Sequence, residues 1–404
     1  MGEIILVNIS GKDQKGLTAR FTNILGQADA NILDIGQSVI HDHISLGILI
    51  EIPESGKSSS ILKNLLFECH KSETKINFTA IDLEEYETWI AEQDMQRRIL
   101  TLIGKNLSAN QVSKVCQVIS NHNLNIDTII RLSERKSLIN QNTRHIASIQ
   151  MSVTGTPEST FNMRKDIMEI SNTTGIDISF QTDDIFRKNR KLVVFDMDST
   201  LIQAEVIDEL AKIAGKENQV AKITALAMEG KIDFDESFRQ RVALLKGLKL
   251  EEIKDLPSKL PLSDGARRVT KILKKLGYKI GILSGGFTFV GDYLKNILNI
   301  DYVYANELDI KDQVVTGKVK GEIINGDKKA ILLKELARKE NLTLSQTIAV
   351  GDGANDLPMI SIAGLGVAFK AKAVVKEKAD SAISGVGLDG LLYLLGIHER
   401  ELDE

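Results

Sequence analysis

The chain has 404 residues and a formal net charge of −4 at pH 7. A chain of this length is expected to form two or three domains, and its weakly acidic balance provides no basic field for nucleic acid or an anionic membrane. No apolar run is long enough to cross a bilayer, and Met1 to Ser10 carry no basic segment of the kind that opens a targeting signal. The two cysteines, Cys69 and Cys116, fall at helix-like apolar positions without metal-ligand spacing. We therefore expect a cytoplasmic protein with reduced thiols, with neither nucleic acid nor membrane as a partner.

The first 83 residues show the pattern of four strands and two helices. A strand at Ile4–Ile9 leads into a polar, glycine-bracketed loop at Gly11–Gly16, and apolar residues then recur at helical spacing from Leu17 onward. Two strands, a helix and a last strand follow, with apolar patterns at Ile44–Ile52 in the second strand, Ile61–Cys69 in the helix and Ile76–Ala80 in the last strand. The predicted order is βαββαβ, a ferredoxin-like α+β arrangement.

The same order recurs after an acidic, aromatic linker at Glu84–Arg98, which indicates an internal repeat. Corresponding positions can be matched between the copies: Asn31 and Ile35 in the first, Asn125 and Ile129 in the second. The copies are unequal, because the second has an enlarged polar hairpin around Ser133–Arg144 and lacks the Lys15-Gly16 end of the first loop.

This tandem pair resembles ACT domains, which are βαββαβ modules that bind amino acids at domain interfaces. The resemblance implies domains at residues 1–83 and 97–182, an amino-acid effector and a homodimer. A glycine-bracketed loop leading into a helix exposes main-chain amides that can hold a carboxylate, so we place the regulatory site at Gly11, Gly16, Ile35 and Gln37. The alternative is a purely structural dimerisation module.

The third part of the chain begins with an unbroken apolar run at Leu192–Phe195, the pattern of a strand buried on both faces of a parallel sheet. Asp196 and Asp198 follow directly and therefore lie at the carboxyl edge of that strand, where open α/β sheets bind ligands. Two carboxylates so placed can share one hard cation, which suggests a metal-assisted nucleophile. For an isolated pair of this kind, an acidic loop that caps the next helix would be the simpler interpretation.

Helical patterns fill almost all of Glu205–Lys259, and from Asp264 onward helices alternate with apolar strands. These strands are expected at Tyr278–Leu283, Tyr302–Tyr304, Thr347–Val350 and Leu365–Ala368. The prediction is a doubly wound, Rossmann-like α/β domain over residues 190–397. The helical stretch at 204–262 is an insertion after the first strand, and we expect it to cover the carboxyl edge as a cap.

Three further segments place polar groups at that edge. Ser284 and Gly285 end the second strand of this domain, and Lys329 lies near the start of a helix, where its charge can neutralise phosphoryl oxygens. Lys328 is the adjacent alternative to Lys329. Asp352, Asn355 and Asp356 follow the apolar strand at Thr347–Val350, where like charges repel unless a cation joins them. Hard oxygen ligands that leave room for water and phosphate favour Mg²⁺.

These motifs, in the order Asp196-x-Asp198, Ser284, Lys329 and Gly351-Asp352-x-x-x-Asp356, resemble those of the haloacid dehalogenase-like (HAD) phosphohydrolases. The resemblance implies that Asp196 is the nucleophile and that Asp198 acts as general acid and then base. It also implies a metal site formed by Asp196, Asp352 and the main-chain carbonyl of Asp198, with Asp356 and Asn355 supporting the metal and its waters.

The expected cap contains one anomaly. Phe234, Phe238 and Arg241 follow helical spacing, so a guanidinium lies within an apolar stripe, and Glu205 offers the opposite charge. A ligand with both a carboxylate and an ammonium group would satisfy this pair, although an arginine that snorkels past the core edge is the ordinary alternative.

Cap and core together resemble the phosphoserine phosphatase family, with Glu205, Met228, Phe234 and Arg241 at substrate-recognition positions and Ser284, Gly285, Lys329 and Asn355 beside the phosphate. The resemblance implies hydrolysis of O-phospho-L-serine through an aspartyl-phosphate, the last step of serine biosynthesis, with L-serine as an effector of the ACT-like repeats. Two alternatives stay open: a HAD phosphatase or phosphotransferase for another small phosphate ester, and a non-catalytic amino-acid sensor.

Overall fold

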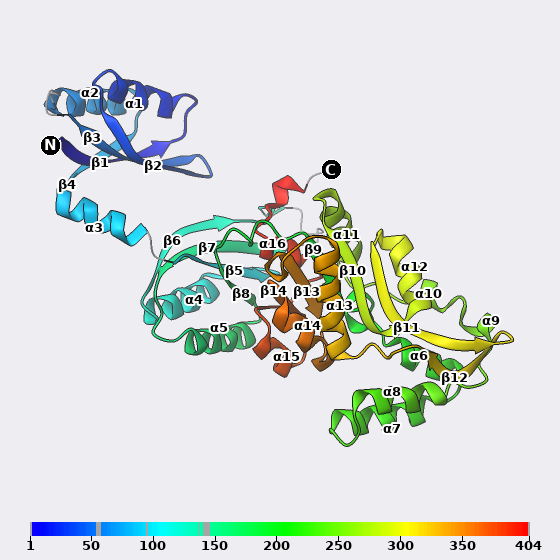
Figure 1. Ribbon diagram of the computed structural model, residues 1–404. Coiled ribbons are helices and arrows are strands. Elements are labelled where there is room, and N and C mark those ends of the chain that lie inside the picture. Colours follow the sequence, from blue (N-terminus) through cyan, green and yellow to red (C-terminus); the bar gives the residue numbers. More distant parts are fainter. Residues whose placement is uncertain (1, 54–57, 94–95, 136, 140–145, 403–404) are drawn as a thin grey trace. The chain divides into compact units, whose positions relative to one another are not determined.

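The computed structural model describes residues 2–53, 58–93, 96–135, 137–139 and 146–402 (Figure 1). The chain divides into two compact units, Met1–Met95 and Gln96–Glu404. Among the described residues, no helix combines the length and apolar character needed to cross a membrane.

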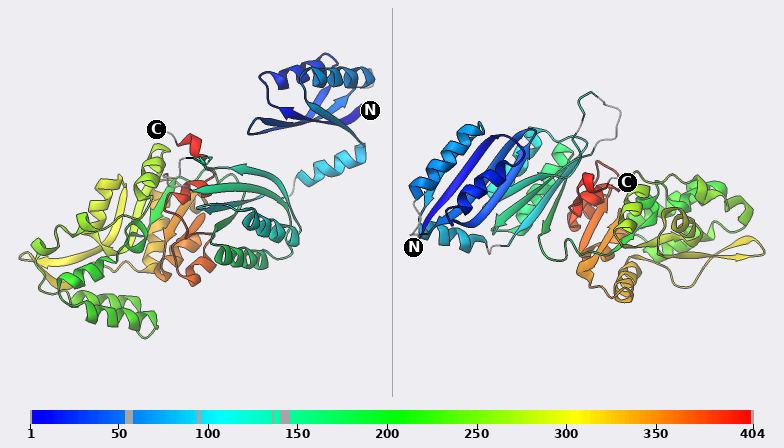
Figure 2. Two further views of the ribbon diagram at one scale, coloured as in Figure 1. Left: turned by 180° about the vertical axis from the view of Figure 1, so that it is seen from behind. Right: turned by 90° about the horizontal axis from the view of Figure 1, so that it is seen from above.

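The first unit has the predicted βαββαβ order, followed by one additional helix. Its antiparallel sheet has the strand order β2-β3-β1-β4, and α1 and α2 lie together on one of its faces (Figures 1 and 2). Alternate apolar residues of β1 and β3 point to that face and form the core with the two helices. The elements are β1 Glu3–Lys12, α1 Leu17–Gly26, β2 Asn31–Ile40, β3 His43–Ile52, α2 Ser58–Lys71, β4 Lys75–Ile81 and α3 Leu83–Gln93.

Two local predictions for this unit were wrong. Gly11 belongs to β1 and pairs with Ile44 across the sheet, so the turn before α1 is shorter than expected. Most of the expected linker is a helix, α3, because the side chain of Asp82 accepts a hydrogen bond from the Glu85 amide (2.8 Å) and acidic residues occupy the first turn. The capping residue Asp82 is visible in the sequence, but the acidic and aromatic composition of this segment had indicated a linker rather than a helix.

The second unit begins with the second βαββαβ repeat, whose sheet has the order β6-β7-β5-β8. Helices α4 and α5 cover one face of this sheet (Figure 1). The elements are β5 Arg98–Gly104, α4 Ala109–Asn121, β6 Leu124–Arg131, β7 Ala147–Gly155, α5 Thr160–Thr174 and β8 Asp177–Thr182. The predicted enlarged hairpin around Ser133–Arg144 lies partly outside the described residues.

The third part of the chain contains a seven-stranded sheet with the order β12-β11-β10-β9-β13-β14-β15, in which only the edge strand β12 runs antiparallel. The strand predicted at Leu192–Phe195, β9, lies at its centre between β10 and β13. Beyond the predicted strands, the sheet contains β12 and β15, and both lie at its edges. The strands are β9 Leu192–Phe195, β10 Lys279–Phe287, β11 Tyr302–Lys311, β12 Val314–Lys320, β13 Thr347–Gly351, β14 Leu365–Phe369 and β15 Ser381–Ile383.

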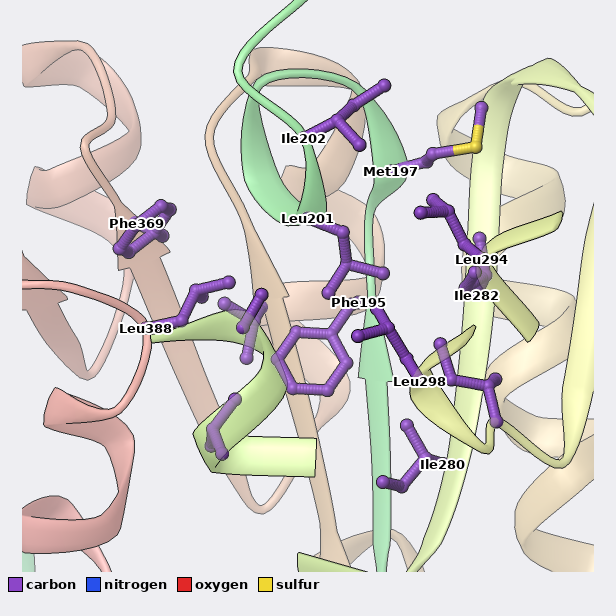
Figure 3. Packing of buried hydrophobic residues seen from close by; sticks show 14 of the residues in the cluster. Phe195, Met197, Leu201, Ile202, Ile280, Ile282, Leu294, Leu298, Phe369 and Leu388 are labelled. Atoms are coloured by element: carbon purple, nitrogen blue, oxygen red, sulfur yellow. The ribbon is translucent and has the colours of Figure 1, made fainter. Parts of the chain in front are cut away.

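Helices cover both faces of this sheet, as a doubly wound domain requires. Val193 and Phe195 pack on the side of α11 and α12, as Figure 3 shows for Phe195, whereas Leu192 and Val194 pack on the side of α13 and α14. This explains why the β9 sequence is apolar at every position. The helices of the core are α11 Ala266–Lys275, α12 Thr288–Leu298, α13 Gly326–Lys339, α14 Leu357–Ile362, α15 Ala373–Lys378 and α16 Gly390–Leu394.

The expected insertion forms five helices between β9 and α11. They are α6 Val206–Ile213, α7 Glu217–Met228, α8 Phe234–Ala243, α9 Leu250–Ile253 and α10 Leu256–Lys259. Residues of α6 and α8, among them Ile207, Phe234 and Phe238, line one cavity together with the carboxyl edge of the sheet. These helices therefore cover that edge in the way a cap does.

Buried polar contacts join the second repeat to the domain with the seven-stranded sheet. Asp177 accepts hydrogen bonds from the amides of Ser384 (2.8 Å) and Gly385 (2.9 Å). Gln181 donates to the Leu394 carbonyl (3.0 Å), and the following connection carries the buried residue Arg190. These contacts explain why the second repeat and the domain with the seven-stranded sheet form one compact unit.

Candidate active site

The turn after β9 places the first carboxylate at the carboxyl edge of the sheet. The Asp196 amide donates to the Val350 carbonyl (2.8 Å), and its carboxylate accepts a bond from the Met197 amide (2.7 Å). Three residues on, Ser199 adopts a left-handed conformation (φ 55°), which turns the chain away from the strand direction. The Asp196 side chain is thereby fixed and almost completely buried.

The turn after the neighbouring strand β13 brings two more carboxylates to the same place. Asp356 is fully buried and accepts bonds from the amides of Asp352 (3.1 Å) and Gly353 (3.0 Å), which closes the loop. Gly351 is required here, because a Cβ atom at this position would lie 2.4 Å from the Asp356 carboxyl carbon. Thr200 donates to Asp352 (3.1 Å) and so connects the two turns.

Carboxylate oxygens of Asp196, Asp352 and Asp356 all lie within 4.8 Å of one another. Burial, reinforced by the neighbouring carboxylates, raises the pKa of Asp196 to about 8 and that of Asp352 to about 7. Carboxyl groups crowded in this way favour a bound cation, and their hard oxygen donors suit a divalent metal ion. The residues therefore fit a metal site. Asp198 is predicted to bind the metal through its main-chain carbonyl. The cluster of carboxylate side chains does not test this, so it stays a prediction.

The one side-chain cation beside these carboxylates, among the described residues, is Lys329. Its Nζ lies 2.8 Å from Asp196 Oδ1 and 2.6 Å from Asp356 Oδ1, in a fully buried position. Lys328, the alternative from sequence, instead pairs with Glu322 (2.6 Å) near the surface. The two lysines differ because α13 turns by about 100° per residue, so only one of two consecutive side chains can face the sheet edge.

The end of β10 supplies a hydroxyl group. Ser284 is fully buried, and its Oγ accepts a bond from the Gly286 amide (2.9 Å). Asn306 on β11 holds this turn in place, because it donates to the Gly285 carbonyl (2.8 Å) and accepts from the Ile324 amide (2.9 Å). No local pattern predicts this role of Asn306, because its partners are 18 and 21 residues away along the chain.

Asp198 differs from the other acidic residues in its surroundings. Burial raises its pKa well above the ordinary value, and the charges of Glu205 and Asp196 act in the same direction. The Val206 amide approaches it at 3.4 Å. A carboxyl group with a raised pKa can stay protonated at neutral pH, and it can therefore donate a proton.

A cavity of about 130 Å³ joins these groups to the cap. It is lined by Asp196, Asp198, Glu205, Ile207, Phe234, Phe238, Arg241, Ser284, Gly285, Gly286, Phe287, Asp352 and Asn355. Two predicted residues, Lys329 and Asp356, are fully buried and do not line the cavity. Met228 does not line it either, because it lies at the end of α7 and is 65% exposed. Ile207, Gly286 and Phe287 were not predicted as site residues; Phe238 belongs to the apolar stripe of α8 and stacks on Phe234 with 6.0 Å between ring centroids.

Comparisons with known proteins agree with this geometry. A haloacid dehalogenase-like hydrolase family matches residues 190–364, and ACT domain families match residues 3–79 and 98–181. A phosphoserine phosphatase from Streptomyces coelicolor is 37% identical over 402 residues, which cover 99% of this chain and 93% of that protein. The chain belongs to the phosphoserine phosphatase family.

A second relative supports the same family assignment. The phosphoserine phosphatase SerB2 of Mycobacterium tuberculosis is 32% identical over 401 residues, covering 99% of this chain and 94% of that protein. A crystal structure of a HAD family hydrolase from Salmonella enterica serovar Typhi has a TM-score of 0.63 and 31% identity, and covers 74% of this chain and 98% of its own. HAD hydrolases typically use a divalent metal ion, in line with the aspartate cluster. The matched ranges lie within the three predicted domains, whose limits stay a prediction.

In this member of the phosphoserine phosphatase family, the oppositely charged Arg241 and Glu205 line the cavity from the cap side. Within the described residues, the guanidinium of Arg241 makes one hydrogen bond, from Nε to the Ser237 carbonyl (3.3 Å), and no carboxylate lies within 4.0 Å of it. Glu205 accepts a bond from Ser199 (2.7 Å), and burial raises its pKa. The Arg241 charge therefore has room for an anionic partner, while Glu205 can accept from a donor.

The predicted regulatory residues all lie in the first unit. Gly16 has φ 79° and precedes the first residue of α1. Thr18, in the first turn of that helix, donates to Gln37 on β2 (2.5 Å), so the loop and the strand are adjacent as expected. Ile35 on the same strand is 47% exposed. Their regulatory role stays a prediction.

Proposed function

We propose that this protein hydrolyses O-phospho-L-serine to L-serine and phosphate. The observation that carries the proposal is the single small cavity that joins Asp196 and Asp198 to Arg241 and Glu205. Phosphoserine presents a phosphate at one end and a carboxylate with an ammonium group at the other, which matches the two ends of this cavity.

The side chains support a two-step transfer. Asp196 attacks phosphorus and forms an aspartyl-phosphate, while Asp198, whose pKa is raised by burial, protonates the leaving oxygen of serine. Asp198, now a carboxylate, then accepts a proton from the water that hydrolyses the intermediate. Lys329, 2.8 Å from the nucleophile, stabilises charge on the phosphoryl oxygens, and Ser284 donates to one of them.

The metal ion in this proposal is Mg²⁺. Asp196, Asp352 and the main-chain carbonyl of Asp198 would hold it, and Asp356 and Asn355 would orient its ligands. When bound, it would screen the negative charge between the nucleophile and the incoming phosphate. Asp356 accepts hydrogen bonds from two amides and from Lys329, and these bonds already engage both of its carboxylate oxygens. This favours a role for Asp356 in holding the metal ligands in place rather than in binding the metal directly.

The cap supplies selection of the serine head group. Arg241 binds the carboxylate in a bidentate manner, Glu205 accepts from the ammonium group, and Phe234 closes the apolar side. Met228 is exposed at the end of α7, so it can contact the substrate only if this end of the helix turns toward the cavity.

Phosphate release from a panel of esters tests this function. Phosphoserine should be hydrolysed far faster than phosphoethanolamine or a sugar phosphate, and EDTA should stop the reaction until Mg²⁺ is added back. Comparable rates on all esters would favour another small-phosphate hydrolase, and saturable phosphoserine binding without phosphate release would favour a non-catalytic sensor.

We also propose that L-serine binds the first repeat and regulates the enzyme in a homodimer. The support is the adjacency of the loop at Gly16 and the strand at Gln37, together with exposed apolar side chains along β2, at Ile32, Ile35, Val39 and Ile40. An effector shifts activity only if it prefers one arrangement of the subunits. Calorimetry with L-serine and sedimentation of the full chain test the two parts of this proposal separately.

A further inference from the structure

The first unit contains a second cavity, of about 390 Å³, on the sheet face that α1 and α2 leave uncovered. The described residues that line it all belong to this unit, and none of them lines the active-site cavity. The lining comes from the four strands and from α3, which follows β4 after a single residue. The residues are Leu6, Asp34, Ile35, Gly36, Gly47, Leu49, Ile81, Glu85, Tyr86 and Trp89.

The hollow exists because two glycines face each other across adjacent strands. Gly36 on β2 pairs with Gly47 on β3, so neither strand contributes a side chain at this point of the sheet. A Cβ atom at Gly36 would meet no atom within 4 Å, which shows that the space above this position is open. Pairing partners point to the same face of a sheet, so Leu6 and Leu49, which pair with each other, form an apolar wall beside the gap.

The remaining wall is aromatic and comes from α3. Tyr86 and Trp89 lie one helical turn apart, with 5.9 Å between their ring centroids, and both line the cavity. Among the described residues of the lining, the charged ones are Asp34 and Glu85, and both are acidic. The position of Glu85 is fixed by its amide, which donates to Asp82 at the start of α3 (2.8 Å).

We propose that this cavity binds a small organic cation that carries an apolar body, such as an aryl- or alkylammonium ion. The apolar walls and the glycine gap accommodate the body. The ring faces of Tyr86 and Trp89 and the carboxylates of Asp34 and Glu85 attract the positive charge. A free amino acid fits less well, because the part of the lining that the structure describes offers no basic side chain for its carboxylate. Of the residues predicted to bind the amino-acid effector, only Ile35 lines this cavity, so the two sites can be tested independently.

The experiment uses the full chain, because Trp89 is its only tryptophan and reports on this cavity directly. The probe is 2-phenylethylammonium, and 3-phenylpropionate serves as its anionic counterpart with the same ring and a similar length. Tryptophan emission should change saturably with the cation and should stay unchanged with the anion. L-Serine at the same concentration should not displace the cation.

Variants separate the proposed site from unspecific binding. Gly36→Leu places a side chain in the gap, where its Cβ atom would meet no other atom within 4 Å, and should abolish the saturable response. Ser38→Leu, on the same face of β2, should retain it. Glu85→Gln should weaken binding up to about fivefold, the range for an exposed ion pair, and Glu87→Gln on the same helix should have no effect.

Three results would overturn the proposal: an equal response to the anion, a response that persists in Gly36→Leu, or no saturable response in the folded chain. If the emission instead follows protein concentration and sedimentation shows association, a second copy of the chain covers this face rather than a small cation.

Discussion

Replacing Arg241 by alanine should impair the reaction of phosphoserine much more than that of phosphoethanolamine. The guanidinium has no carboxylate partner within 4.0 Å among the described residues, so its charge is available to the carboxylate of the substrate. Losing a hydrogen bond to a charged group costs about 1.5–3 kcal/mol, which corresponds to a loss of about 10- to 150-fold in kcat/KM. Phosphoethanolamine keeps the phosphate and the ammonium group but lacks the carboxylate, so its kcat/KM should change little.

The assay is phosphate release from both esters by wild type, Arg241→Ala and Arg241→Lys. The lysine variant keeps the charge and loses the planar fork, so its phosphoserine activity should lie between the other two. Thermal unfolding should be nearly unchanged, because the one hydrogen bond that Arg241 makes to a described residue goes to its own helix, at the Ser237 carbonyl. Equal losses on both esters would refute the reasoning and would show that Arg241 supports the fold of the cap.

The remaining predictions concern the nucleophile, the buried lysine and the first repeat. Asp196→Asn should keep the fold but lose hydrolysis. Asp198→Asn should also be inactive but should bind metal better than Asp196→Asn. Phosphate release and metal titration check both variants, and near-wild-type turnover in either would contradict the role assigned to that residue. Lys329→Met should lower stability by about 3–5 kcal/mol in denaturant unfolding, because it leaves buried carboxylates without their cation, whereas Lys328→Met should leave stability unchanged. Gly16→Ala should weaken L-serine binding in calorimetry, because the φ of 79° strains any side chain at this position. Gly26→Ala is the matched control. Equal heats of L-serine binding in the two variants would exclude the loop at Gly16 from the binding site.

Much of the catalytic core could be predicted because its signals are local. The apolar run at Leu192–Phe195 predicts a strand buried on both faces, and β9 is indeed buried at every position at the centre of the sheet. The carboxyl ends of parallel neighbours meet at one edge, so Asp196 and Asp352 had to converge once β9 and β13 were adjacent. Spacing within a helix likewise placed Phe234 and Arg241 on one side of α8.

The features that the sequence did not predict depend on pairings over long separations. Asn306 contributes through partners on two other segments, and the packing of the second repeat on the core depends on Asp177 and Gln181, more than 200 residues from their partners. Met228 shows the converse limit. A motif can place a residue at a substrate position in the family, but the exposure of its side chain depends on how the end of α7 is turned.

The electrostatics of the active site tie its chemistry to its structure. Asp196, Asp352 and Asp356 are drawn together by main-chain amides, by Thr200 and by Lys329, and not by any attraction between them. One lysine cannot balance three carboxylates, which is why burial and mutual repulsion raise the pKa of Asp196 and Asp352. The rigid strands on either side supply the free energy that holds this unfavourable arrangement, since β9 and β13 are buried along their whole length. A cation and a phosphate that enter together carry opposite charges into the site, so each makes the binding of the other more favourable.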